Sequence, residues 1–208
     1  MSARILLTGF GPFPRAPVNP TVALVARLAR IGRRHGIDCV AHVFDTSYAA
    51  VDRELPALIA AHRPDAIVMF GLAAGRKAVS IETFARNRAS SSFPDAARAT
   101  PRRGTIAPGA PASVRGRAPF IRLIAAARAT RVRAALSRNA GNYLCNYVYW
   151  RALEAAAQPG GPRLAVFVHV PSVAAKFRPR AGRRRGRRFT LDALARAGRA
   201  ILLAVSRC

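Results

Sequence analysis

The chain has 208 residues, of which 51% are hydrophobic, so it can bury a substantial core and is not a disordered polypeptide. It carries 35 Lys and Arg against nine Asp and Glu, a formal net charge of +26. No apolar run reaches the ~18–20 residues that span a bilayer. The apolar stretch near the start of the sequence is too short for a signal peptide. The odd number of widely spaced cysteines predicts neither a disulfide framework nor a metal site. A cytoplasmic protein with free thiols and no cofactor is therefore expected.

The first seventy residues predict strands that alternate with helices. Residues 4–8 form an apolar run that ends in a glycine- and proline-rich turn. Asn19 precedes Pro20, which is typical of a helix N-terminus. The pattern then indicates a strand over 37–44, a helix over 48–62 and a nearly all-apolar strand over 65–71. Such strands are typical of parallel sheets covered by helices on both faces.

The second half of the chain continues the alternation after an irregular middle segment. The alternating residues 78–86 indicate one further strand, and residues 88–117 form a long irregular excursion. The remaining pattern predicts helices over 119–129 and 142–156, strands over 131–136 and 164–170, and a last helix capped by Thr190. We therefore expect a single α/β domain over 1–208, with three α/β/α layers and a mainly parallel twisted sheet.

Three reactive side chains stand out, and each has two interpretations. Cys145 lies near the start of a predicted helix, where the helix dipole and free N–H groups would lower the thiol pKa. His169 lies at the end of a strand, where functional groups gather in open α/β sheets, and could act as a base. Glu82 lies in an apolar stretch and could orient a histidine. Equally, Cys145 could be a core thiol, His169 a structural histidine and Glu82 the partner of an arginine.

Five segments in order resemble the pyroglutamyl peptidase I (pyrrolidone-carboxylate peptidase) family of cysteine peptidases. They are Leu7-Thr8-Gly9-Phe10-Gly11-Pro12-Phe13 with Asn19-Pro20, Gly71-Leu72-Ala73-Ala74-Gly75-Arg76, Ile81-Glu82-Thr83-Phe84-Ala85-Arg86-Asn87, Ala140-Gly141-Asn142-Tyr143-Leu144-Cys145-Asn146 and Val168-His169-Val170-Pro171. The resemblance implies a single α/β/α domain that removes N-terminal pyroglutamate from peptides.

The resemblance also implies a role for each reactive residue. Cys145 would be the nucleophile, His169 would move the proton, and Glu82 would orient the imidazole. An acyl-enzyme would form and water would hydrolyse it. By family position the substrate slot would be lined by Phe10, Phe13, Asn19, Thr46, Tyr143 and Leu144. Core packing of the first turn is the alternative interpretation for Phe10 and Phe13.

The chain departs from the family pattern in two places. Ser92 stands where the family commonly has an arginine, so that backbone N–H groups near Cys145, or Arg88, would have to stabilise an oxyanion. Residues 98–118 lack the usual tyrosine-containing loop, which bears on substrate grip and on contacts within a possible homo-oligomer.

The tract over 176–188 holds eight Lys and Arg and no acidic residue. A mobile, solvated loop is the expected structure, because like charges repel one another. Binding of nucleic acid is the alternative interpretation, and GC-rich codon usage is a further source of the arginine excess. The peptidase function has two alternatives. One is a catalytically weak homologue that binds nucleic acid, and the other is an amidase for another small acyl group. Neither a membrane nor a metal partner is expected.

Overall fold

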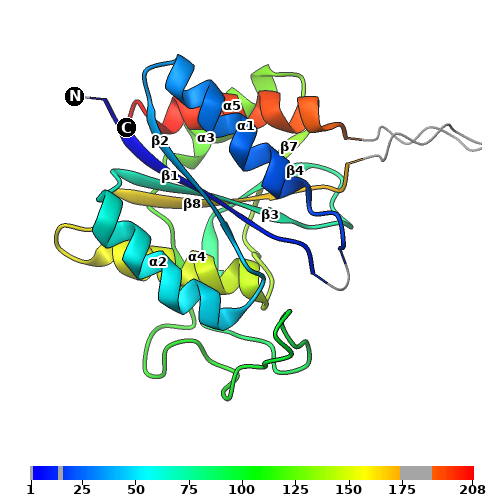
Figure 1. The fold of residues 1–208 in the computed structure, drawn as a ribbon, viewed down its shortest axis with the longest axis vertical. Coiled ribbons are helices and arrows are strands. Elements are labelled where there is room, and N and C mark those ends of the chain that lie inside the picture. The colour runs from blue at the N-terminus through cyan, green and yellow to red at the C-terminus, as the bar shows by residue number, and fades with distance from the viewer. Residues whose placement is uncertain (1, 14–15, 174–188) are drawn as a thin grey trace, which may run out of the picture.

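The computed structural model describes residues 2–13, 16–173 and 189–208 (Figure 1). The basic tract over 176–188 lies outside the described residues. Strands and helices alternate along most of the described chain. The strands are β1 (Arg4–Phe10), β2 (Asp38–Phe44), β3 (Ala66–Leu72), β4 (Val79–Glu82), β5 (Phe84–Arg86), β6 (Ser113–Arg115), β7 (Ala134–Ser137) and β8 (Leu164–Val170). The helices are α1 (Pro20–Arg34), α2 (Tyr48–His62), α3 (Phe120–Ala129), α4 (Leu144–Ala157) and α5 (Leu191–Val205). None of these helices is long and apolar enough to cross a membrane.

Six of the strands form one twisted sheet in the order β2-β1-β3-β8-β4-β7. Neighbouring strands are parallel except for β4 and β8, which are antiparallel. The predicted α/β fold with a mainly parallel sheet is confirmed. β3 and β8 occupy the centre, where nearly every residue is buried, as their continuous apolar sequences predicted.

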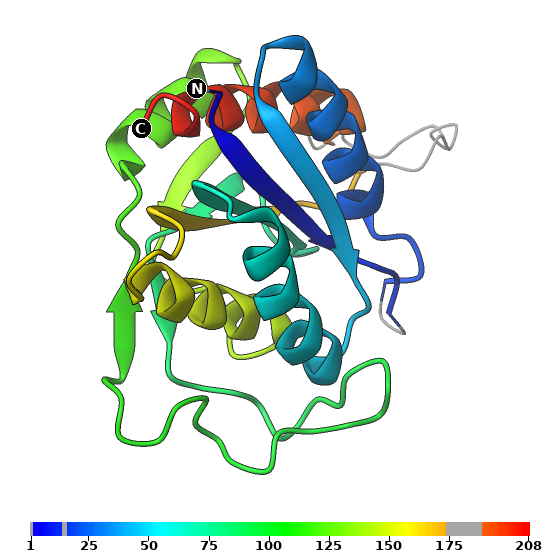
Figure 2. The same ribbon diagram turned by 60° about the vertical axis from the view of Figure 1, so that its left-hand side comes forward.

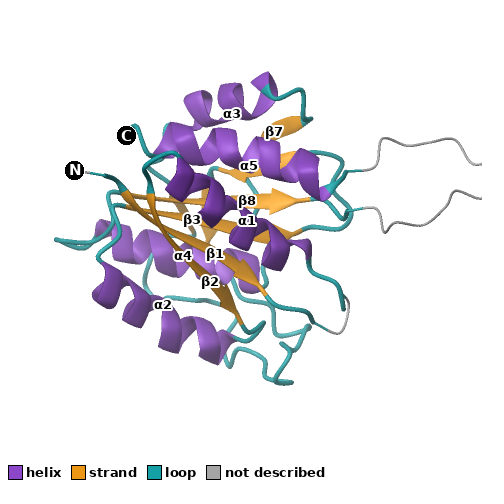
Figure 3. Cartoon of the chain, turned by 45° about the horizontal axis from the view of Figure 1, so that its top comes forward, coloured by secondary structure: helices purple, strands orange, loops and turns teal. Residues whose placement is uncertain are grey.

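Helices cover both faces of this sheet, and each layer packs on its own hydrophobic cluster. Helices α1, α3 and α5 lie on one face, and α2 and α4 lie on the other (Figure 2). The cartoon coloured by secondary structure shows the sheet as the middle layer between them (Figure 3). The carboxyl ends of β1, β2, β3 and β8 meet at one edge of the sheet, which is where ligands bind in folds of this kind.

The helix N-termini follow from local capping. The Asn19 side chain accepts a hydrogen bond from the Thr21 N–H, and Pro20 occupies the first turn of α1. The Thr190 side chain caps α5 in the same way by accepting from the Ala193 N–H. Both predicted caps are confirmed.

The prediction of one strand over 78–86 is wrong, because the segment divides at Thr83. The Thr83 N–H donates to the Ser137 carbonyl at the end of the main sheet, whereas the Thr83 carbonyl accepts from the Gly116 N–H. The chain therefore leaves the main sheet after β4, and β5 pairs with β6 in a separate two-stranded ribbon. The change is visible in the burial pattern, since β4 is fully buried and β5 ends on an exposed residue.

The excursion over 88–117 is irregular apart from β6, and it runs beyond α2 and α4 on the side away from the sheet (Figures 1 and 2). The Asn87 side chain organises it. Its Nδ2 donates to the Ala107 and Ala110 carbonyls, and its Oδ1 accepts from the Ile106 and Ala107 N–H groups. One amide thus satisfies four backbone groups that no regular element would satisfy.

Candidate active site

Glu82 and His169 form a buried pair at the join between β4 and β8. Glu82 is fully buried and His169 is 5% exposed. The His169 Nδ1 atom lies 2.8 Å from Glu82 Oε1. Because an ionised carboxylate only accepts hydrogen bonds, Nδ1 carries the proton and Nε2 keeps its lone pair. The imidazole therefore has the tautomer of a general base.

The sheet register explains why two residues 87 positions apart meet. In the antiparallel β4–β8 pairing, Ser80 lies opposite His169 and Glu82 lies opposite Phe167. Alternate residues of a strand share one face, so Glu82, Phe167 and His169 lie on the same face. The Phe167 ring contacts the imidazole edge-on, with the ring centroids 4.9 Å apart. The one antiparallel pairing of the six-stranded sheet thus brings the carboxylate to the histidine.

Arg76 is a further member of this cluster, although its sequence context did not point to a catalytic role. Its Nη2 atom lies 2.7 Å from Glu82 Oε1 and donates to the Asn139 carbonyl at 2.7 Å. The guanidinium offsets the cost of burying an ionised carboxylate and holds the turn after β3 against the segment that leads to α4. Its place in the glycine-rich turn was a signal that could have identified it.

Cys145 is the second residue of α4 and is partly buried. Its sulfur lies against Gly71 of β3, where a Cβ atom added to the glycine would be 2.8 Å from Cys145 Sγ and 2.5 Å from Phe167 Cζ. Gly71 is paired with His169 in the parallel β3–β8 register. The thiol therefore lies over the backbone next to the imidazole, and only glycine leaves room for it there.

The predicted lowering of the Cys145 pKa is wrong. Burial raises the pKa of the thiol to about 12, and the Glu82 carboxylate raises it further. The Arg76 charge and the Cys145 N–H act in the opposite direction but are weaker. The helix N-terminus is present as expected, yet desolvation outweighs it. Burial also lowers the pKa of His169, although the hydrogen bond that His169 donates to Glu82 acts in the opposite direction. At pH 7 the thiol and the imidazole are therefore both neutral.

The first turn of the chain is fixed by Asn19 and Thr46. Asn19 Nδ2 and Thr46 Oγ1 both donate to the Gly11 carbonyl, at 3.1 and 3.0 Å. Asn19 Oδ1 accepts from the Thr21 backbone N–H and hydroxyl. Phe10 is 4% exposed and packs on Phe44, with 5.9 Å between the ring centroids. These groups hold the turn at the carboxyl end of β1, at the same edge of the sheet as His169.

The other predicted slot residues flank the same edge. Tyr143 immediately precedes α4, is partly buried and donates from its hydroxyl to the Pro94 carbonyl at 3.0 Å. Leu144, the first residue of α4, is buried. Phe13 is partly exposed and exchanges two backbone hydrogen bonds with Ala16.

The segment around Cys145 is held by buried hydrogen bonds, whereas Ser92 is exposed. The fully buried Asn146 side chain binds the Arg86 N–H and the Arg86 and Arg88 carbonyls, so it ties the start of α4 to β5. Ser92 and Arg88 are both exposed. The arginine whose charge favours the Cys145 thiolate is Arg76.

Within the described ranges, no group of three His, Cys, Asp or Glu side chains could hold a metal ion.

Comparisons of the sequence and of the structure with known proteins find the same family. The family model for pyroglutamyl peptidase matches residues 3–184. The chain belongs to the pyroglutamyl peptidase family. It is 33% identical to the pyrrolidone-carboxylate peptidase of Thermococcus kodakarensis over 168 residues, which is 81% of each chain. It is 35% identical to that of Gloeobacter violaceus over the same length and the same shares.

The solved structures of pyroglutamyl peptidases extend the likeness to nearly the whole fold. The pyroglutamyl peptidase I of Bacillus amyloliquefaciens superposes with a TM-score of 0.85 at 26% identity, covering 99% of this chain and 96% of that one. The pyrrolidone carboxyl peptidase of Fervidobacterium islandicum superposes with a TM-score of 0.87 at 26% identity, covering 99% of both chains. The resemblance inferred from the five sequence segments is confirmed.

Proposed function

We propose that Cys145, His169 and Glu82 hydrolyse the N-terminal pyroglutamyl residue from peptides, the reaction of the family to which the chain belongs. The observation that carries the proposal is the arrangement at the sheet edge. A buried carboxylate binds His169 Nδ1 at 2.8 Å, and the Cys145 sulfur lies over Gly71, the residue paired with that histidine. A nucleophile, a base and a group that orients the base are the parts of a thiol hydrolase.

In the first half-reaction, the thiol is activated as the substrate is attacked. The Cys145 proton passes to His169 Nε2 while the Sγ–carbon bond forms at the pyroglutamyl carbonyl. The imidazolium then donates that proton to the peptide nitrogen, the carbon–nitrogen bond breaks, and the shortened peptide leaves. Glu82 stabilises the imidazolium that forms between these two steps. A neutral resting pair suits this order, because the base is unprotonated when the substrate arrives.

In the second half-reaction, His169 takes a proton from water as the water oxygen attacks the thioester. The carbon–sulfur bond breaks, the proton returns to sulfur, and free pyroglutamate leaves. The charge that develops on the carbonyl oxygen in both halves needs donors. Helix α4 begins without a side-chain cap, which leaves N–H groups of its first turn beside Cys145 for that purpose.

The slot would bind a small, flat and uncharged ring. Phe10, Leu144 and Tyr143 pack in one apolar cluster, and Phe13 in the first turn is partly exposed. Thr46 and Asn19 hold the backbone of the first turn in place. The free thiols and the thiol chemistry support action in the reducing cytoplasm. Peptides with N-terminal pyroglutamate are the proposed substrates.

The test is hydrolysis of a pyroglutamyl-fluorophore amide by the purified chain. We expect turnover that disappears in Cys145→Ala and after alkylation of Cys145. Cys208→Ser is the matched control, since this terminal thiol contacts the Ala204 carbonyl and should leave turnover unchanged. A panel of other acyl amides tests selectivity for the pyroglutamyl group. Turnover by Cys145→Ala would contradict the proposal.

A further inference from the structure

Tyr48 holds a buried hydroxyl for which the described chain provides no partner. Tyr48 is the first residue of α2 and is 9% exposed. Its backbone N–H donates to Asp95 Oδ2 at 2.9 Å, but its hydroxyl has no hydrogen-bond partner among the described residues. Buried polar groups are nearly always paired, so an unpaired one in a native structure requires an explanation.

The other three tyrosines of the chain show how unusual this is. The Tyr147 hydroxyl donates to Asp52, the Tyr149 hydroxyl to the Glu82 carbonyl, and the Tyr143 hydroxyl to the Pro94 carbonyl. Tyr48 is the exception, although it is nearly as buried as Tyr147. An unsatisfied hydroxyl lowers the stability of the free enzyme, so phenylalanine would be the better residue here if packing were the only role.

Neighbouring rings hold the Tyr48 hydroxyl in one place. The Tyr147 ring stands edge-on to it at 90°, with centroids 5.0 Å apart, and the Tyr143 ring stands edge-on at 87°, with centroids 6.0 Å apart. Tyrosine has only two side-chain torsions, and packed rings on two sides restrict both. The hydroxyl is therefore a fixed donor rather than one that turns out to solvent.

Tyr48 packs beside the segment that holds the nucleophile, because its ring contacts that of Tyr143, two residues before Cys145. Burial raises the pKa of Tyr48. Tyr48 also belongs to the same apolar cluster as Phe10 and Leu144, against which Tyr143 and Cys145 pack. Because its pKa is raised, the phenol is a neutral proton donor at every pH at which the enzyme works. A neutral donor suits an uncharged carbonyl.

From these observations we infer that the Tyr48 hydroxyl is a substrate-binding group that donates a hydrogen bond to the lactam carbonyl of the pyroglutamyl ring. This inference rests on the proposed function. The ring presents one carbonyl and one N–H, with no charge, so its recognition in an apolar slot depends on a few placed polar groups. The scissile carbonyl already has the first turn of α4 beside Cys145, whereas Tyr48 lies on α2 and serves a different atom. Bound substrate supplies the partner that the free enzyme lacks.

The test compares ligand binding and stability in Tyr48→Phe. The probe is 2-pyrrolidone, the bare lactam ring, whose binding is measured by titration calorimetry or ligand-observed NMR without any turnover. We expect the affinity to fall by between about 5- and 100-fold, because the lactam carbonyl loses its donor in a buried site. We also expect the Tm of the free enzyme to rise by about 2–6 °C, because the unpaired hydroxyl is gone. A tyrosine that does not contact the substrate would leave the 2-pyrrolidone affinity unchanged, so the affinity is the result that decides.

Tyr147→Phe is the matched control, since it removes a hydroxyl from the adjacent ring that is already bound to Asp52. This variant should lower the Tm and leave 2-pyrrolidone affinity unchanged. A second probe, pyrrolidine-2-thione, replaces the carbonyl oxygen by a weaker acceptor. The wild type should prefer the oxygen compound more strongly than Tyr48→Phe does, and this difference isolates the hydroxyl–carbonyl contact.

The outcomes separate this inference from the proposed function. Unchanged 2-pyrrolidone affinity in Tyr48→Phe, or a fall in its Tm, would overturn the role of Tyr48 even if the wild type hydrolyses pyroglutamyl amides. Tyr48-dependent binding by a wild type that hydrolyses none of them would support the binding role and overturn the proposed function.

Discussion

At the scale of single residues, the chemistry depends on how burial changes the charges of three side chains. Cys145 and His169 are both neutral at rest, and the Glu82 carboxylate contacts both Arg76 and the His169 Nδ1–H. The sequence predicted all three residues, from their reactive side chains and from the family resemblance of the segments that hold them. It could not give the sign of the Cys145 shift, since desolvation depends on what packs over the helix N-terminus.

Glu82→Gln tests the charge of the carboxylate without changing its shape. The Glu82 Oε2 atom has no hydrogen-bond partner among the described residues, so an amide NH₂ can occupy its place while Oε1 still accepts from His169 and Arg76. The variant should fold, yet its kcat should fall by roughly 10²–10⁴-fold, because an amide cannot balance the imidazolium. Steady-state kinetics and circular dichroism check the two halves of this prediction. Near-wild-type turnover would mean that the carboxylate is structural.

The pH dependence of kcat/KM tests the neutral resting pair. Burial lowers the pKa of His169, so the imidazole is the free base at pH 7 and becomes protonated only below the ordinary histidine value of about 6.5. We expect kcat/KM to be flat near pH 7 and to fall on acidification below that value, as the base is lost. The Glu82 hydrogen bond raises the pKa of His169, so the acid limb should move to lower pH in Glu82→Gln. An acid limb above pH 7 would contradict a neutral resting imidazole.

At the scale of elements, the site is made by strand register. Gly71 of β3 and His169 of β8 are adjacent, and the antiparallel β4 adds Glu82. The apolar runs and the caps Asn19 and Thr190 predicted the principal helices and most strands of the main sheet, because these signals are local. Strand order and the direction of β4 are set by contacts between distant segments, which no single window of sequence contains.

Gly71→Ala tests the close approach of α4 to β3. The added Cβ would lie 2.8 Å from Cys145 Sγ and 2.5 Å from Phe167 Cζ, so the thiol or the Phe167 ring must shift. We expect a loss of about 1–3 kcal/mol in the free energy of unfolding and a larger relative loss of kcat/KM. Gly75→Ala in the following turn is the control, because nothing lies within 4 Å of its added Cβ. Denaturant unfolding and kinetics on both variants make the comparison. Full activity in Gly71→Ala would show that the thiol is not held at this position.

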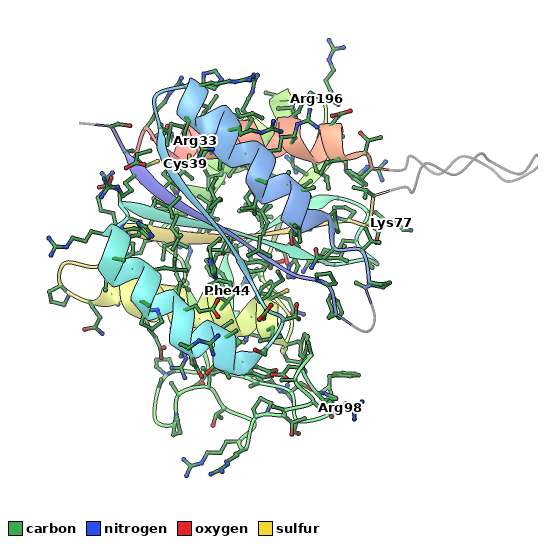
Figure 4. The ribbon with its side chains drawn as sticks, viewed as in Figure 1. Arg33, Cys39, Phe44, Lys77, Arg98 and Arg196 are labelled. Atoms are coloured by element: carbon green, nitrogen blue, oxygen red, sulfur yellow. The ribbon has the colours of Figure 1, made fainter. Side chains whose placement is uncertain are left out.

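At the scale of the whole molecule, the dominant feature is the net charge of +26. The acidic groups of the helices gather on one layer, with Asp52, Glu54 and Glu154 on α2 and α4. The layer of α1, α3 and α5 has Asp192 as its one acidic group within the helices, and Arg27 pairs with it. Figure 4 shows Arg196 on α5 and Arg98 in the excursion on opposite sides of the molecule. Positive charge is therefore present on opposite sides of the molecule.

This charge should act on the rate at which peptides arrive rather than on the chemistry. Long-range attraction speeds the association of oppositely charged ligands and is screened by salt. For pyroglutamyl peptides rich in Asp and Glu, kcat/KM should fall by roughly 10-fold between low and physiological ionic strength, whereas a neutral pyroglutamyl amide should change little. Initial-rate assays on the two substrates across a salt series make the measurement. Equal salt dependence for both would contradict electrostatic steering.

The thiol mechanism is tested most sharply by looking for the acyl group on Cys145. The enzyme is mixed with an activated pyroglutamyl ester, quenched in acid during turnover, digested and analysed by mass spectrometry. We expect the pyroglutamyl group on the peptide that contains Cys145, none on peptides that contain Cys39 or Cys208, and no turnover in Cys145→Ala. Burial raises the pKa of Cys39 to about 11 and covers it, so that thiol should stay unmodified. Turnover with no acyl group on Cys145, or turnover by Cys145→Ala, would contradict catalysis through a Cys145 acyl-enzyme.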